Sequence, residues 1–316
     1  MSSSTVLPRL HIVALLSAVL ALPMVTFRSA AAQTIPVASV FVSAVDKDDV
    51  PVTELSEDDV EIKIAGKTQE VLATRPAERP LRVSILVSDG GTGAFQRGIL
   101  NFVQKLYGRA EFQFGQLLPP EKLGPYAREQ NALMAEISKL GVRAGSRVGA
   151  QITEGILEAA KDIGVGGEGL RKVILVLRIG NEAPSTIDAK LVRSELQKSG
   201  AVLYVISTQG SNRQPSQSAN SGSMDPTTRA MGQSVDAEAT NAAMNISLIL
   251  GDGSKESGGR HDEVTSVTLA KAVESIADEL LGQFEVAYLL PENYKPTDKF
   301  SVTSKRRGLT IRAPSR

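Results

Sequence analysis

The chain contains no cysteine. A disulfide, a thiolate nucleophile, a zinc–thiolate site and a lipidated N-terminal cysteine are therefore all excluded. Tryptophan is also absent and aromatic residues make up only 4% of the chain, so an aromatic platform for sugars or for stacked bases is not expected. Stability must come from aliphatic packing, for which a hydrophobic content of 42% is typical of ordinary globular domains.

Neither sign of charge is in excess, since 35 basic side chains face 35 acidic ones. Loss of Arg9 and Arg28 with the N-terminal segment described next would leave 33 against 35, a net charge of −2. This balance gives no electrostatic reason to expect nucleic acid or an anionic membrane as a partner.

Residues 1–32 have the pattern of a secretory signal peptide. A basic start precedes the apolar run IVALLSAVLALPMVTF, and three consecutive alanines end at Ala32. We expect cleavage between Ala32 and Gln33 and a secreted or periplasmic mature chain. The alternative is an uncleaved N-terminal anchor, although Pro23 interrupts the apolar run and the run is short for a bilayer span.

The stretch 33–78 contains short apolar segments separated by turns, namely VASVFVSAV, DKDDVP and DDVEIKIAGKTQEVL. Alternation of apolar and polar residues with period two is typical of strands that bury one face. The sequence therefore predicts a small antiparallel β module, immunoglobulin-like or similar. The segment ATRPAERP, with its two prolines, is interpreted as a linker.

The pattern changes over the range 79–316. Runs such as VSILV, VILVL, AVLYVIS and FEVAYLL are short, β-branched and nearly continuous, as in strands that are covered on both faces, and EFQFGQLL adds a further alternating segment. Amphipathic helical stripes lie between them. The stripes include Ile99, Ile156, Leu191 and Ile276. This order predicts an α/β domain with a doubly wound, mostly parallel sheet.

Residues 209–240 are poor in large apolar side chains and rich in Ser, Gln, Asn and Gly. Such a segment cannot bury enough apolar surface to offset the entropy of ordering, so we predict a flexible loop within the α/β domain. A partner-binding loop that becomes ordered on contact is the alternative.

Several segments, taken in order, resemble a bacterial group of exported proteins that carry a von Willebrand factor A-related domain. AVDKDDVPVTELSEDDVEIKIAGKTQEV resembles the opening β module of that family, and RPLRVSILVSD is similar to its first core strand. RKVILVLRIG is similar to its fourth strand, LILGDGSKESGGR to a segment ending in a T-G-G turn, and IADELLGQFEVAYLLP with RGLTIRA to its closing elements. The resemblance implies a von Willebrand factor A-like fold and a binding role.

The resemblance also implies a divalent-cation site at the carboxyl edge of the sheet. Its ligands would come from a D-x-S-x-S loop, a threonine in a second loop and an aspartate after the fourth strand, all of them oxygen ligands suited to Mg²⁺. In this chain Asp89 matches the first aspartate, whereas Gly91 and Gly93 stand at both hydroxyl positions. Thr92 offers an oxygen one residue out of phase.

The other ligand positions depart further from the family pattern. Ala150 stands where the second loop should supply threonine, and Ile179 replaces the final aspartate, with Arg178 adding a positive charge. We therefore predict a degenerate metal site and no cofactor. The alternative is a Mg²⁺ site that Asn181 and Glu182, which follow closely, help to complete.

Asp89 also has an interpretation that involves no ligand. An aspartate often ends a strand by accepting hydrogen bonds from the following turn. The glycine-rich turn after Asp89 could, in addition, offer backbone N–H groups to an anion.

Catalytic motifs are not found: the chain has no G-x-S-x-G elbow, H-E-x-x-H pair or phosphate-binding G-x-x-x-x-G-K-[ST] loop. Without residues 1–32, His261 is the only histidine, so a Ser-His-Asp arrangement would have to use it. We expect the surrounding SGGRHDEV to be a polar surface loop. The sequence thus predicts a non-enzymatic protein-binding or adhesion-type module with an unknown protein partner, and a hydrolase built around His261 is the alternative.

Overall fold

The computed structural model describes residues 36–89, 92–117, 124–140, 151–180, 185, 187–208 and 240–315. The expected signal peptide over 1–32 lies outside the described residues, as does the expected loop over 209–240 apart from Thr240. Within the described ranges, no helix has the length and apolar character needed to cross a membrane.

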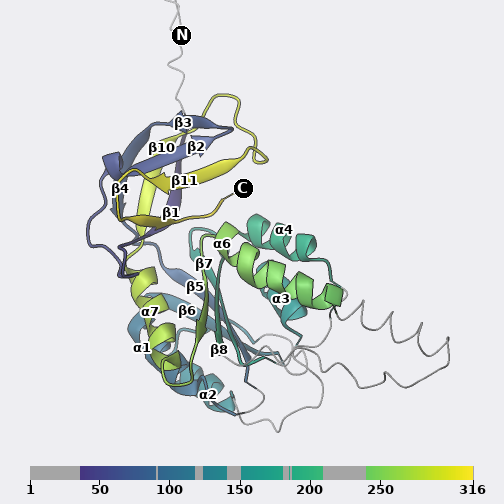
Figure 1. The fold of residues 1–316 in the computed structure, drawn as a ribbon. Coiled ribbons are helices and arrows are strands. Elements are labelled where there is room, and N and C mark those ends of the chain that lie inside the picture. Colours follow the sequence, from purple (N-terminus) through teal and green to yellow (C-terminus); the bar gives the residue numbers. More distant parts are fainter. Residues whose placement is uncertain are drawn as a thin grey trace, which may run out of the picture. The chain divides into compact units, whose positions relative to one another are not determined.

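A five-stranded sheet has the order β6-β5-β7-β8-β9, and every neighbouring pair in it is parallel. Its strands are β5 (Leu81–Ser88), β6 (Ala110–Gln116), β7 (Arg171–Arg178), β8 (Val202–Thr208) and β9 (His261–Val264). Figure 1 shows the sheet with helices on both sides. The predicted α/β class with a doubly wound parallel sheet is confirmed.

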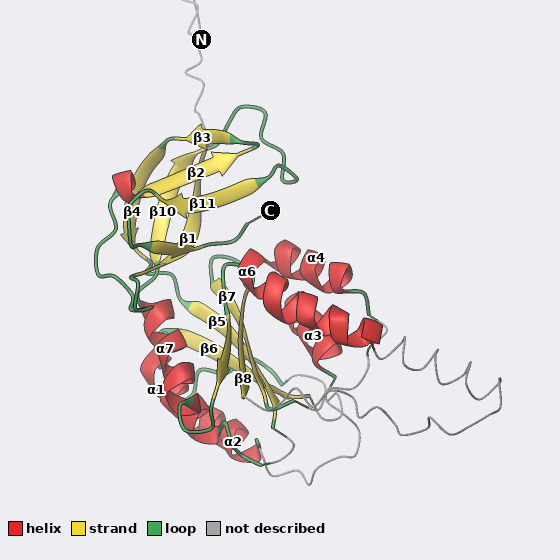
Figure 2. Cartoon of the chain, viewed as in Figure 1, coloured by secondary structure: helices red, strands yellow, loops and turns green. Residues whose placement is uncertain are grey.

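Both faces of this sheet are apolar, because consecutive residues of its central strands point to opposite sides. In β7, Val173, Leu175 and Leu177 pack into one core, whereas Ile174 and Val176 pack into the other. Helices cover the two faces separately (Figure 2). The first core lies under α1 (Gln96–Leu106), α2 (Gln130–Lys139) and α7 (Leu269–Leu281); the second lies under α3 (Ile152–Gly164), α4 (Ala189–Ser199) and the helical stretch 240–253, which is followed by α6 (Ser254–Glu256).

Local signals fix where these helices begin and end, as α4 illustrates. The side chain of Asp188 accepts a hydrogen bond from the backbone N–H of Lys190 at 2.8 Å, which satisfies one of the unpaired donors of the first turn. Gly200 ends the helix at φ +69°, a left-handed conformation that favours glycine.

Seven strands form the β module. They are β1 (Val37–Val45), β2 (Val60–Ile64), β3 (Lys67–Gln69), β4 (Val71–Pro76), β10 (Phe284–Leu289), β11 (Phe300–Ser304) and β12 (Thr310–Arg312), with the short helix η1 (Glu57–Asp59) between β1 and β2. One antiparallel sheet has the order β12-β1-β10-β4, and the other has the order β11-β2-β3. Their inward side chains, which include Val42, Ile62, Val286 and Val302, form a third core.

The expectation that FEVAYLL belongs to the parallel sheet is wrong. The strand β10 pairs antiparallel with β1 on one side and with β4 on the other. A short apolar run looks the same in a parallel sheet and in the core of two packed sheets, so the sequence could not separate the two cases. The β module therefore contains residues 284–312 in addition to residues inside the range 33–78.

Candidate functional site

The carboxyl edge of the parallel sheet brings together strand ends that are far apart in the sequence. The register places Ser88 of β5 beside Arg178 of β7, and Arg178 beside Ser207 of β8. Loops beyond this edge are the usual place for ligand binding in open α/β sheets. The sequence-predicted residues Asp89, Thr92 and Arg178 do lie at this edge.

Asp89 begins the turn that follows β5 and is only 5% exposed. Its backbone carbonyl accepts hydrogen bonds from the backbone N–H of Thr92 at 3.2 Å and from the Thr92 hydroxyl at 2.9 Å. Gly93 has φ +69°, which a serine would adopt only with strain. At Gly93, which stands at the second serine position of the family's D-x-S-x-S loop, the backbone conformation therefore favours glycine.

Arg178 is a buried cation at the end of β7, only 7% exposed. Its Nη1 lies 3.5 Å from the Oγ of Ser207 on the next strand. The neighbouring Ile179 donates its N–H to the carbonyl of Ser88 at 3.0 Å and packs against the core below. The position where the family has a metal-binding aspartate thus serves sheet pairing and apolar packing.

His261 does not lie in a polar loop, so that expectation is wrong. It is the first residue of β9, an edge strand in which it pairs with Val205 of β8. Its Nε2 lies 2.8 Å from the Oγ of Ser207. Because HDEV contains only one apolar residue, the sequence carried no strand signal here.

The electrostatic surroundings of His261 favour its neutral form. Burial lowers the pKa of the imidazole, and the positive charge of Arg178 lowers it further, against the opposing effect of Glu263 and Asp262. At neutral pH the ring is therefore uncharged and can share a hydrogen bond with Ser207 in either direction.

The pair of Ser207 and His261 has the spacing of a nucleophile and its base. However, Ser207 is only 3% exposed. Among the described residues, no carboxylate is hydrogen-bonded to the Nδ1 of His261 to orient the ring. The geometry pairs a buried hydroxyl with a half-buried imidazole and offers a substrate little access to Ser207.

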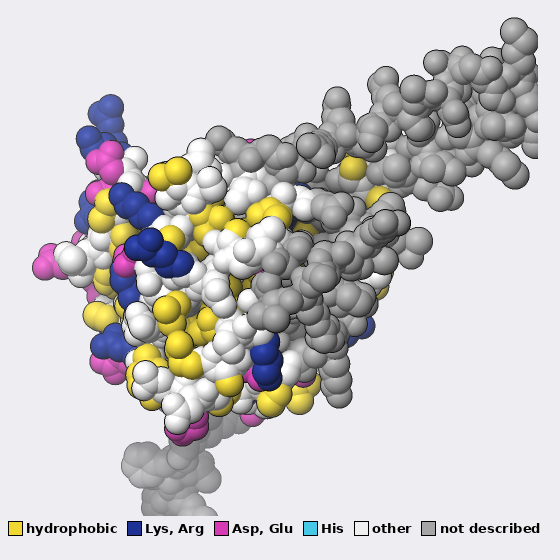
Figure 3. All heavy atoms as spheres, turned by 90° about the horizontal axis from the view of Figure 1, so that it is seen from below, with side chains coloured by type: hydrophobic (Ala, Val, Ile, Leu, Met, Phe, Trp, Pro, Cys, Tyr) yellow, Lys and Arg dark blue, Asp and Glu magenta, His cyan; other side chains and the backbone are white. Residues whose placement is uncertain are grey.

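Three residues predicted for this edge, Gly91, Asn181 and Glu182, lie outside the described part of the chain. Their roles stay predictions. Within the described part, no group of three or more His, Asp or Glu side chains is placed to hold a metal ion. Figure 3, the view from below, shows hydrophobic side chains interspersed with acidic and basic ones on the visible face, without a field of one sign.

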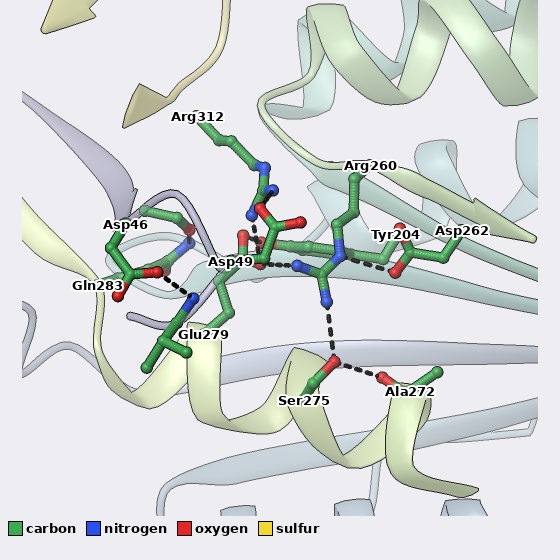
Figure 4. Close-up of polar contacts among 12 residues, drawn as sticks. Asp46, Asp49, Tyr204, Arg260, Asp262, Ala272, Ser275, Glu279, Gln283 and Arg312 are labelled. Carbon is green, nitrogen blue, oxygen red and sulfur yellow. Dashed lines mark hydrogen bonds and ion pairs between the residues drawn. The ribbon is translucent and has the colours of Figure 1, made fainter. Parts of the chain in front are cut away.

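A second polar cluster lies at the other end of the α/β part and was missed by the sequence analysis (Figure 4). Its centre is Glu279 of α7, which is 1% exposed and accepts hydrogen bonds from three residues. The donors are the Tyr204 hydroxyl at 3.0 Å, Arg260 Nη1 at 2.8 Å and Arg312 Nη1 at 3.0 Å. Burial holds the pKa of Tyr204 well above its ordinary value, so the hydroxyl remains a donor.

Further contacts extend this cluster into the β module. Arg312 belongs to β12 and also pairs with Asp49 at 2.5 Å. Arg260 Nε lies 2.8 Å from Asp262 Oδ2, close enough for an ion pair but without hydrogen-bond geometry. Gln283 Nε2 donates to the Ser43 hydroxyl of β1 at 3.1 Å. The two parts of the chain are thus joined by the part-buried ion pair of Arg312 with Glu279 and by the buried hydrogen bond of Gln283 to Ser43.

No family model matches the chain, and no curated protein matches it. Solved structures similar to it include the pilus adhesin SpaC from Lactobacillus rhamnosus GG, at 9% identity and a TM-score of 0.43 over 81% of this chain. The chain spans about half of that adhesin, 48% of its length.

Two further similar structures are a von Willebrand factor A domain and a coat protein. The SpRpn10 von Willebrand factor A domain has 12% identity and a TM-score of 0.38, with 61% of this chain and 93% of that domain covered. The human COPII-coat protein Sec24c has 6% identity and a TM-score of 0.39, with coverage of 76% and 44%. TM-scores this low do not define a fold by themselves. The fold assignment therefore rests on the strand order and the helix positions described above.

Proposed function

We propose that the chain is an exported, non-catalytic protein-binding module of the adhesion type that acts without a bound metal ion. One observation carries the metal independence: the buried guanidinium of Arg178 lies in the strand row where the family resemblance implies a cation site. Like charges repel each other, and most strongly where burial reduces screening by the solvent. A cation bound beside Asp89 would have to overcome this repulsion.

Calorimetric titration of the purified protein with Mg²⁺ and then Mn²⁺ tests the metal independence. We expect no saturable heat from wild type or from Asp89→Ala. Saturable binding by wild type that Asp89→Ala abolishes would overturn metal independence and establish the cation-dependent alternative. An Arg178→Gln variant sharpens the test, because removal of the guanidinium should raise any residual affinity for the cations.

A crosslinking experiment tests protein binding at the carboxyl edge. A photoreactive amino acid replaces Thr92, which is exposed in the turn after β5, in the cell that naturally produces the chain. The matched control carries the same group at Glu168, which is exposed just before β7 and so lies at the opposite edge. We expect protein adducts from position 92 alone; equal adducts from both positions, or none, would contradict binding at this edge.

Hydrolysis through Ser207 is a second candidate function, favoured by the 2.8 Å contact between its Oγ and His261 Nε2. A fluorophosphonate probe tests it, because such probes react only with activated serines. Under the non-catalytic proposal, we expect no labelling, since Ser207 is 3% exposed. Labelling that is lost in both Ser207→Ala and His261→Gln would establish the hydrolase and overturn the leading proposal.

A further inference from the structure

One edge of β1 is paired over only part of its length. The strand β10 pairs with residues Val37–Val42 on one side. On the other side, β12 pairs only with Ser43–Val45. Among the described residues, no strand pairs with the portion Val37–Phe41 on that second side.

The register shows which backbone groups of β1 this edge presents. The backbone N–H of Leu290 donates to the carbonyl of Pro36 at 2.9 Å, so the even-numbered residues of β1 direct their backbone groups toward β10. The odd-numbered residues Val37, Ser39 and Phe41 therefore direct their N–H and C=O groups toward the unpaired edge. They continue the row in which Ser43 and Val45 pair with β12.

A cavity of about 770 Å³ opens beside this edge. We call it the β1 seam, and define it as the space between Ser39–Val40 of β1, helix α4 and Phe300 of β11. Pro314 and Ser315, which follow β12, form one end of it. The seam thus begins where β12 stops, and its volume lies within the range of about 300–1,000 Å³ that is typical of ligand pockets.

The wall of the seam combines aromatic and basic side chains. Tyr288 and Phe300 face it with ring centroids 5.8 Å apart. Lys190 and Lys299 are exposed beside them. The lining also includes Arg193 of α4, which forms an ion pair with Glu256, the one acidic residue of the wall. Because the charges of Arg193 and Glu256 offset each other, the remaining positive charges of the seam are those of Lys190 and Lys299.

We propose that the β1 seam binds an acidic, extended segment of a partner protein, which pairs with Val37–Phe41 as an added strand in continuation of β12. Main-chain hydrogen bonds to an exposed sheet edge supply affinity in this mode, and pockets for alternate side chains supply selectivity. The two lysines favour carboxylates on the added segment, and the ring surfaces that line the seam favour contact with an apolar side chain. The β1 seam is separate from the carboxyl edge of the parallel sheet, so an experiment can disprove binding at one of these sites without disproving it at the other.

Fluorescence anisotropy with a labelled Glu-Val-Glu-Val-Glu peptide tests the proposal, since about five residues match the length of the unpaired edge. Two comparison peptides are Lys-Val-Lys-Val-Lys and a version of the acidic peptide with proline at its centre. We expect saturable binding of the acidic peptide alone, with weakening as salt is raised. Failure of the acidic peptide to bind, or equal binding of the basic one, would overturn the proposal.

Ser39→Pro gives the sharpest variant. It removes the N–H of Ser39 that faces the unpaired edge and leaves the ladder with β10 intact, as proline is tolerated on edge strands. It also removes the Ser39 hydroxyl, so Ser39→Ala, which lacks the hydroxyl but keeps the N–H, is the matched control. We expect about a tenfold loss of affinity for Ser39→Pro and less than about twofold for Ser39→Ala.

A charge reversal tests the basic wall in the same way. Lys190→Glu should weaken the acidic peptide, whereas Lys198→Glu should not, because Lys198 lies on the same helix outside the seam. Amide signals of Val37, Ser39 and Phe41 should shift on peptide addition. Equal affinity in wild type and Ser39→Pro would overturn strand addition. Concentration-dependent dimerisation that Ser39→Pro abolishes would make a second copy of the chain the occupant and also overturn the proposal.

Discussion

The two ends of the α/β part use polar side chains in different ways. At the end near the β module, Glu279 is 1% exposed and is bonded to Tyr204 and to two arginines. At the carboxyl edge, the Ser207 and His261 side chains share one hydrogen bond beside Arg178. The first arrangement joins distant segments, including β12, whereas the second lies within three adjacent strands of one sheet.

This difference has an energetic consequence. Removing a buried carboxylate that serves three donors breaks two ion pairs and leaves each arginine with a single acidic partner. A single neutral hydrogen bond contributes only about 1 kcal/mol. The cluster around Glu279 should therefore resist substitution, while the Ser207–His261 pair at the carboxyl edge should tolerate it.

Glu279→Gln should have the largest effect on the free energy of unfolding. We expect a loss of about 3 kcal/mol, near the lower bound for breaking a buried ion pair, because Arg312 keeps Asp49 and Arg260 keeps Asp262. Urea denaturation followed by circular dichroism measures this loss.

The control for that variant is Glu274→Gln on the same helix. Its side chain is 37% exposed and pairs with Lys105 at 3.1 Å, so the expected loss is below about 1 kcal/mol. Equal losses from the two substitutions would show that the buried cluster adds nothing beyond a surface ion pair, and the contrast between the two ends would then fail.

Gly258→Ala should have the second largest effect, because it disturbs the path by which the chain leaves β12. Gly258 has φ +89°, and a Cβ there would lie 2.6 Å from the carbonyl carbon of Ala313. We expect a loss of about 2 kcal/mol from backbone strain and this collision. Thermal unfolding measures it, with Gly169→Ala as the control.

Gly169 separates the two contributions. It has φ +75° with no atom within 4 Å of the added Cβ, so its substitution carries the conformational cost alone, about 1 kcal/mol. If both variants lose the same amount, residues 313–315 move aside freely. In that case the amide hydrogen of Ser315, which is donated to the Glu256 carbonyl at an N–O distance of 2.7 Å, should exchange quickly with solvent.

Periodicity predicted most of the α/β part, because each face of a covered sheet needs its own apolar set. The run VILVL in β7 divides cleanly between the two cores, and the stripe through Ile276 of α7 packs on one of them. The same signal misassigned β10, since its inward residues Phe284 and Val286 fit a core between two β sheets equally well.

The cluster around Glu279 could not be predicted from local pattern. Its donors Arg260 and Arg312 lie 19 and 33 residues away in the sequence, and a glutamate in a helix is ordinarily exposed. The arrangement at the carboxyl edge could be predicted only in part, for a different reason. The resemblance to the family indicated the positions of Asp89 and Arg178. The pairing of Ser207 with His261 could not be predicted, because it depends on a strand that carries no apolar alternation.

The smallest expected effect is the contribution of His261 to the pH dependence of the free energy of unfolding. It tests whether the carboxyl edge favours the neutral imidazole. The folded-state pKa of the imidazole is lowered below 6.5 by burial and by Arg178. The stability from the neutral ring is therefore complete above about pH 6.5 and is lost as pH falls through the lowered pKa, because the unfolded state takes up the proton first. His261→Gln should flatten this part of the curve of unfolding free energy against pH. Since His261 is the only histidine beyond residue 32, proton NMR of its ring tests the sign directly: a folded pKa at or above 6.5 would mean that the edge stabilises the charged imidazole, and that a negative group lies closer to the ring than Arg178.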